Sequence, residues 1–143
     1  MTVATFSQLN LVTRDLAASL AFYRHLGLTA EAAPDGIHAS ARPPGGPAIE
    51  WDTEQFAAQW DSGSRGATGG ATVLGFSVPT RQSVDELYAE LTSGGYRGHQ
   101  QPYDACWGSR YAIVDDPDGN PVGLMSPRSP ELQHWPPRQA PAT

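Results

Sequence analysis

Polar residues that could do chemistry alternate with apolar ones in two short stretches of the sequence. FSQLNLV, residues 6–12, carries Gln8 and Asn10, and AIEWD, residues 48–52, carries Glu50. Because successive side chains of a strand point to opposite faces, each stretch would present its polar groups on one surface. A buried carboxylate can act as a general base, and amide groups orient a ligand through directed hydrogen bonds. We therefore expect these three side chains to line a small-molecule site.

The other reactive residue types are sparse. Cys106 is the single cysteine, which excludes an intrachain disulfide and an all-cysteine metal cage. His25 and His38 have no second histidine two or four residues away, and we interpret each as a structural or surface residue. With a net charge of -6 and 17% charged residues, the chain lacks the positive field that nucleic acid or an anionic membrane attracts. Neutral or cationic ligands are favoured instead.

The chain of 143 residues is long enough for one domain with a sizeable core. It shows no signal-peptide pattern and no apolar span of the length that a membrane helix needs. We expect a cytoplasmic protein that binds neither nucleic acid nor membrane.

The strand expected over residues 6–12 is followed by an amphipathic helix. RDLAASLAFYRHLGL begins with a good N-cap, Asp15, and ends at Gly27. Between them, apolar residues recur at helical spacing: Leu16, Leu20, Tyr23 and Leu26. Residues 36–52 then predict two strands joined by a loop rich in proline and glycine, and the Gly-rich stretch 62–70 is typical of a linker.

The pattern starts again with an offset of 65 residues. Core positions of the first half recur in order in the second: Leu9 as Leu74, Leu11 as Phe76, Tyr23 as Tyr88 and Leu26 as Leu91. A strand is predicted over 72–78 and a helix over 83–95, in which Ser83 and Glu86 have the spacing of a capping box. Three further strands are expected near 96–100, over 109–116 and over 121–125, separated by the DPDGN turn. Each half thus predicts a strand, a helix and three strands.

Two such units in tandem, with LVTRDLAASLAFYRHLGL and RYAIVDDPDGNPVGL, resemble the vicinal oxygen chelate superfamily. That superfamily includes glyoxalase I, extradiol dioxygenases and bleomycin-resistance proteins, and the resemblance covers roughly residues 5–126. It implies an α+β fold of two βαβββ modules, whose curled mixed sheets surround a cleft. The domain would span residues 1–126, with modules at about 5–61 and 71–126.

In active members of that superfamily, a divalent metal is held by side chains from the first and last strands of each module. The resemblance carries those four positions onto Gln8, Glu50, Val73 and Gly123. Valine and glycine offer no side-chain donor, and a hard cation needs several oxygen or nitrogen ligands. We therefore expect no metal and no other cofactor.

The cleft should be lined by the strand faces that point away from the helices. Tyr103 and Trp107 would add rings that stack on a planar ligand, whereas Trp51 has the parity of a core residue. The expected ligand-binding residues are Gln8, Asn10, Glu50, Val73, Gly75, Ser77, Tyr103, Trp107, Gly123 and Met125, and Asp52 lies on the same face.

Two functions remain open at this point. The first is a metal-independent binding protein of the bleomycin-resistance type, which holds an aromatic or cationic molecule. The second is a lyase, isomerase or cyclase, or a dioxygenase-related enzyme, in which Glu50 is the catalytic base. We further expect a homodimer, and a proline-rich arm over residues 127–143 that lies outside the fold and is anchored by Trp135.

Overall fold

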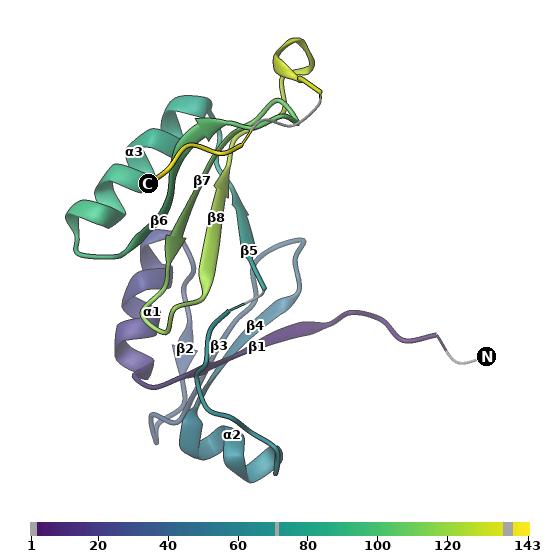
Figure 1. Cartoon of the computed structure of the whole chain (residues 1–143). Coiled ribbons are helices and arrows are strands. Elements are labelled where there is room, and N and C mark those ends of the chain that lie inside the picture. The colour runs from purple at the N-terminus through teal and green to yellow at the C-terminus, as the bar shows by residue number, and fades with distance from the viewer. Residues whose placement is uncertain (1–2, 71, 136–138) are drawn as a thin grey trace. The chain divides into compact units, whose positions relative to one another are not determined.

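The computed structural model describes residues 3–70, 72–135 and 139–143. The chain divides into two compact units, Met1–Thr68 and Gly69–Thr143, and each contains one four-stranded sheet (Figure 1). The boundary falls inside the Gly-rich stretch that the sequence marks as a linker. Residue 71, at the start of the expected second module, and residues 136–138 of the expected arm lie outside the described residues.

The first unit is a mixed sheet with the strand order β1-β4-β3-β2, in which β1 and β4 run parallel and the other neighbours antiparallel. Its elements are β1 (Gln8–Thr13), α1 (Leu16–His25), β2 (Glu31–Ala32), β3 (His38–Ala41), β4 (Ala48–Thr53) and α2 (Glu54–Trp60).

Helix α1 forms as its sequence predicts. The side chain of Asp15 accepts a hydrogen bond from the backbone of Ala18, and Gly27 adopts the left-handed conformation just beyond the end of the helix. Trp51 is fully buried, and its ring meets that of Tyr23 edge-on at a centroid distance of 5.4 Å. The expectation that Trp51 belongs to the core is confirmed.

The second unit repeats the architecture, with the order β5-β8-β7-β6. In the first unit Asn10 is paired with Glu50, and in the second Gly75 is paired with Gly123, so the two parallel pairs share one register. The predicted α+β fold of two βαβββ modules is therefore confirmed. The elements are β5 (Leu74–Ser77), α3 (Arg81–Ser93), β6 (Gly98–Asp104), β7 (Arg110–Asp115), β8 (Pro121–Met125) and the 3-10 helix η1 (Pro130–Leu132).

The predicted N-cap of the second helix is wrong by three residues. Thr80 is the N-cap of α3, and its hydroxyl accepts a hydrogen bond from the backbone N–H of Ser83. Ser83 therefore lies inside the helix, where its spacing to Glu86 has no capping role. The offset of 65 residues maps the first cap, Asp15, onto Thr80, so the internal repeat was the better guide.

The sequence reading also missed α2. Thr53 ends β4 and caps this helix by accepting a hydrogen bond from the backbone of Phe56. The helix has only seven residues and buries only Ala57, so its apolar periodicity is short. It contacts β4 and β1.

The sequence predicts a C-terminal arm that lies outside the fold. In the structure, residues of this segment instead form hydrogen bonds with the second unit. The backbone N–H groups of Ser129 and His134 donate to the carbonyls of Gly108 and Cys106, and the hydroxyl of Thr143 accepts from the backbone of Gln101 on β6. Trp135 is not the anchor, since it is 83% exposed. Backbone pairing holds this segment against the second unit.

None of the helices in the described part of the chain combines the length and apolar character that crossing a membrane requires.

Candidate functional site

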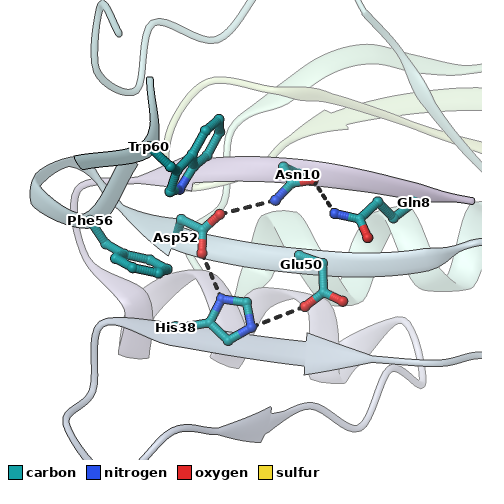
Figure 2. A pocket seen from close by; sticks show the side chains of 7 residues that line it. All are labelled: Gln8, Asn10, His38, Glu50, Asp52, Phe56 and Trp60. Atoms are coloured by element: carbon teal, nitrogen blue, oxygen red, sulfur yellow. Dashed lines mark hydrogen bonds and ion pairs between the residues drawn. The ribbon is translucent and has the colours of Figure 1, made fainter. Parts of the chain in front are cut away.

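The first unit carries a pocket of about 440 Å³ on the sheet face that points away from α1. Strands β1, β3 and β4 form its floor, and α2 forms one wall (Figure 2). The side chains that line it are Gln8, Asn10, His38, Glu50, Asp52, Phe56 and Trp60. Charged and aromatic groups thus meet in one cavity.

Strand register explains why the polar side chains meet. Asn10 is paired with Glu50 across the parallel β1–β4 pair, and His38 with Asp52 across the antiparallel β3–β4 pair. Residues two apart on a strand share a face, so Gln8 joins Asn10 and Ser40 joins His38. The alanines that alternate with them, such as Ala39, are buried on the helix side.

A continuous chain of polar contacts crosses this floor. The Gln8 amide donates to Asn10 Oδ1 over 2.8 Å, and Asn10 Nδ2 donates to Asp52 Oδ2 over 3.0 Å. The other oxygen of Asp52 lies 2.6 Å from His38 Nδ1, and His38 Nε2 lies 3.1 Å from Glu50 Oε2 (Figure 2). The imidazole is thus held between two carboxylates.

The two carboxylates are almost completely withdrawn from solvent. Asp52 is 1% exposed and Glu50 is 6% exposed. Glu50 Oε1 accepts a hydrogen bond from the Ser40 hydroxyl over 3.1 Å and lies 3.6 Å from the guanidinium of Arg42 at the surface. Glu50 Oε2 faces His38 Nε2 without hydrogen-bond geometry, which leaves it as a buried acceptor without a hydrogen-bond donor. Because Oε2 is sealed from solvent, a cation in the pocket would stabilise the Glu50 carboxylate at short range rather than through a direct hydrogen bond to this oxygen.

Helix α2 adds the aromatic wall. Phe56 and Trp60 are four residues apart and therefore lie on one face of the helix. The Phe56 ring meets the His38 ring at a centroid distance of 5.9 Å, and Trp60 is 52% exposed. An exposed indole beside buried carboxylates suits an aromatic or cationic group.

Three of the predicted site residues, Gln8, Asn10 and Glu50, lie together in this pocket, with Asp52 beside them. The interpretation of His38 as an isolated residue is wrong, because linear spacing does not show the strand pairing that brings it into this pocket. A hairpin centred on the proline- and glycine-rich loop pairs His38 with Asp52, and that register was the available signal. Phe56 and Trp60 were missed together with α2.

The remaining predicted residues belong to the second unit. Gly75, Ser77, Gly123 and Met125 share the sheet face opposite α3, together with Tyr103 of β6 and Tyr111 of β7. Val73 lies one residue before β5 and is 47% exposed. Trp107, in the loop between β6 and β7, meets the Tyr111 ring at a centroid distance of 5.2 Å. Tyr111 itself was not predicted.

The side chains present do not fit a divalent metal at the four positions carried over from the superfamily. Val73 and Gly123 have no donor atom, so Gln8 and Glu50 alone remain. Within the described residues, no three His, Cys, Asp or Glu side chains are grouped in a way that could hold a metal ion. His38, Glu50 and Asp52 are close, but the ring directs its two nitrogens at the two carboxylates.

Comparisons with known proteins agree with this fold. A family model described as Glyoxalase/Bleomycin resistance protein/Dioxygenase superfamily matches residues 5–124. No curated protein shows significant sequence similarity to the chain.

Several solved structures share the architecture. A glyoxalase-related enzyme from Fulvimarina pelagi is 18% identical, with a TM-score of 0.78 over 87% of this chain and 89% of its own. A glyoxalase/bleomycin resistance protein/dioxygenase family enzyme from Burkholderia phytofirmans PsJN is 25% identical, with a TM-score of 0.70 over 86% of this chain and 98% of its own. Lactoylglutathione lyase from Agrobacterium tumefaciens is 21% identical, with a TM-score of 0.65 over 88% of this chain and 96% of its own.

Proposed function

The chain belongs to the Glyoxalase/Bleomycin resistance protein/Dioxygenase superfamily, and from this premise we propose that it is a metal-independent binding protein of the bleomycin-resistance type. Its ligand is a small cationic molecule with an aromatic part, held in the pocket of the first unit. The observation that carries the proposal is the pair of buried carboxylates, Glu50 and Asp52, beside the exposed indole of Trp60.

Physical chemistry favours a cation at this position. A buried carboxylate oxygen without a hydrogen-bond donor is costly, and a ligand that supplies positive charge removes that cost. Glu50 Oε2 is such an oxygen, and its nearest polar neighbour is His38 Nε2 at 3.1 Å, so the positive charge of a ligand would act on this carboxylate through space. The ring of the ligand would stack on Trp60 or Phe56, which stand at the edge of the same cavity. Gln8 and Asn10 orient the polar part of the ligand through their amide groups.

The test uses benzyltrimethylammonium as the probe and benzyl alcohol as its neutral counterpart. We expect the cation to bind the wild-type protein, and Glu50→Gln to weaken binding about tenfold, the effect of losing one charge-assisted contact of about 1.4 kcal/mol. Isothermal titration calorimetry measures both affinities. Glu86→Gln, an exposed position on α3, removes the same charge elsewhere and should bind like the wild type. Equal affinity for cation and alcohol would contradict the proposal.

A second function is supported by the same geometry. Glu50 lines the pocket and is 6% exposed, which suits a general base, and the His38–Asp52 contact resembles the pairing that orients a catalytic imidazole. A lyase, isomerase or cyclase would use Glu50 to remove a proton next to a carbonyl. Incubation with phenylacetone, a neutral ketone with acidic protons next to its carbonyl, in D₂O, followed by NMR, tests this activity. Deuterium incorporation that Glu50→Gln abolishes would favour the enzyme over the binding protein.

We also propose that the protein is a cytoplasmic homodimer. Members of the superfamily commonly complete their clefts across subunits. In this chain Val3 is 83% exposed and Phe6 is 73% exposed, and a partner subunit would cover such apolar side chains. Light scattering at micromolar concentration should give about twice the 15.3 kDa of one chain. A particle of the single-chain mass would contradict the dimer.

A further inference from the structure

The carboxylate oxygens of the first unit's pocket all face protein groups. Asp52 Oδ1 lies 2.6 Å from His38 Nδ1, and Asp52 Oδ2 accepts from the Asn10 amide over 3.0 Å. Glu50 Oε1 accepts from the Ser40 hydroxyl over 3.1 Å, and Oε2 lies 3.1 Å from His38 Nε2 (Figure 2). Since Asp52 is 1% exposed and Glu50 6%, a ligand in the cavity reaches little of these oxygens.

The negative charge of the carboxylates still acts on the cavity. Coulomb attraction requires no direct contact, and water and salt screen it less beside buried groups than at the surface. Even with a protonated His38, the two carboxylates and the imidazolium would sum to one negative charge. Arg42 lies 3.6 Å from Glu50 Oε1, but its side chain is 76% exposed and its charge is therefore screened by water. A ligand cation is thus attracted through space.

Aromatic rings stand at one end of this cavity. Figure 2 shows Phe56 and Trp60 at the Asp52 end and Gln8 at the opposite end. The Phe56 ring meets the His38 ring at a centroid distance of 5.9 Å, and the indole of Trp60 is 52% exposed. The faces of such rings attract quaternary ammonium groups without any hydrogen bond.

A protonated amine and a quaternary ammonium make different demands on this cavity. The N–H donors of a primary ammonium lose water on entry and need acceptors inside. Among the side chains that line the pocket, the exposed acceptors that remain are the neutral amide oxygens of Gln8 and Asn10. Asn10 Oδ1 already accepts from the Gln8 amide over 2.8 Å. A quaternary ammonium has no N–H group to satisfy, so it enters at a lower cost.

We propose that the pocket selects fully alkylated cations, such as a quaternary ammonium, over protonated amines of the same charge. This inference rests on the proposed function, because it assigns the chemical class of the ligand held in the same pocket. The positive centre lies against Trp60 and Phe56, and Glu50 and Asp52 attract it through space. Both kinds of cation experience the same charge, so the N–H groups and the ring faces determine the difference in affinity.

The test compares four benzylic cations that each carry one positive charge at neutral pH: benzyltrimethylammonium, benzyldimethylammonium, benzylmethylammonium and benzylammonium. Along this series the number of N–H donors rises from none to three. Isothermal titration calorimetry should give affinities that fall in the same order. We expect benzyltrimethylammonium to bind about tenfold more tightly than benzylammonium.

Variants separate this selection from the apolar area that each methyl group adds. Trp60→Leu keeps an apolar side chain but removes the ring face, so the preference for benzyltrimethylammonium should fall to about threefold or less. Trp135→Leu removes an indole that is 83% exposed in the second unit, and the preference should stay at about tenfold. Glu50→Gln should weaken both end members of the series by the same factor, because neither contacts the carboxylate directly. Thermal melting shows that each variant remains folded.

Three results would overturn the inference and leave the proposed function standing. The first is benzylammonium that binds as tightly as benzyltrimethylammonium while both bind more tightly than benzyl alcohol. The second is an undiminished preference in Trp60→Leu. The third is a larger loss for benzylammonium than for benzyltrimethylammonium in Glu50→Gln, which would reveal a direct hydrogen bond to the carboxylate. Equal affinity of all four cations and benzyl alcohol would instead refute the proposed function together with this inference.

Discussion

Single residues account for the chemistry that this chain can support. In the first unit His38 lies between Glu50 and Asp52, and these three residues, with Asn10 and Gln8, form one connected polar network. Such networks define side-chain positions when their members are satisfied, and a remaining free acceptor marks where a ligand can bind. Glu50 Oε2 is the oxygen of this network that accepts no hydrogen bond, and its close contact is the ion pair with His38 Nε2 over 3.1 Å.

Alkaline titration gives a prediction for Tyr103 and Tyr111 of the second unit. Burial raises the pKa of Tyr111, and burial together with the neighbouring Cys106 raises that of Tyr103, above the ordinary value of 10.0. Tyr103 and Tyr111 should therefore ionise late when absorbance at 295 nm is followed against pH. Tyr111→Phe should remove one member of this late class.

The sign of the accompanying change in stability follows from linkage. A raised pKa means that the folded protein holds the phenolic proton more tightly than the unfolded chain does. The contribution to the free energy of unfolding is fully present below pH 10.0, the ordinary tyrosine pKa, and is lost as pH rises through the folded pKa. Ionisation of all five tyrosines in one step near the ordinary pKa would contradict this prediction.

The sequence predicts which side of its strand most candidate site residues occupy, but it does not predict which residues of neighbouring strands they contact. Alternation in β1 and β4 puts Gln8, Asn10 and Glu50 on one side of their strands. His38 gains its role only through antiparallel pairing with β4, which linear spacing does not contain. Gly123 was recognised as unusual, and the DPDGN turn placed it correctly in β8. The Tyr111 side chain that approaches it comes from a neighbouring strand, which the linear sequence does not show.

At the scale of elements, caps and turns determine where each strand or helix that carries a site residue begins. Asp116 illustrates the point, since its side chain accepts hydrogen bonds from the backbone of Asp118 and of Asn120 and thereby closes the turn before β8. The internal repeat predicted the order of strands and helices because both modules bury the same faces. It did not predict α2, which has no α-helical counterpart after β8 in the part of the second unit that the structure describes.

The start of α3 offers a direct comparison of two cap assignments. Thr80→Ala removes the acceptor of the Ser83 N–H and should lower the free energy of unfolding by about 1 kcal/mol. Ser83→Ala places a strong helix former inside the helix and should cost much less. Urea denaturation of both variants measures the difference. A larger loss in Ser83→Ala would support the capping box that the sequence suggested.

For the molecule as a whole, the C-terminal segment is part of the second unit. It pairs with Gly108 and Cys106 in the loop that carries Trp107, and with Gln101 on β6. Removing residues 127–143 should therefore lower the melting temperature by several degrees, since a loss of about 1 kcal/mol shifts the melting temperature of a domain of this size by a few degrees.

Trp135→Ala provides the control for this truncation. The side chain is 83% exposed, so its removal should leave the melting temperature unchanged within about one degree, in line with surface substitutions generally. An unchanged melting temperature after truncation would show that the observed backbone pairing does not stabilise the unit.

The superfamily's metal chemistry makes a stringent comparison possible. Val73→His with Gly123→Glu restores donors at the two empty positions, but a glutamate at 123 would collide with the Tyr111 ring. We therefore expect the double variant to gain affinity for nickel or zinc only when Tyr111→Ala is added. Calorimetry on the double and triple variants measures this gain.

Metal independence is the central claim, and elemental analysis combined with cation binding tests it most directly. The purified wild-type protein should contain less than stoichiometric divalent metal, and treatment with EDTA followed by gel filtration should leave its affinity for benzyltrimethylammonium unchanged. Glu50→Gln, handled in parallel, should bind the cation about tenfold more weakly with or without EDTA. Stoichiometric metal that disappears in Glu50→Ala, together with loss of cation binding after EDTA, would contradict the account.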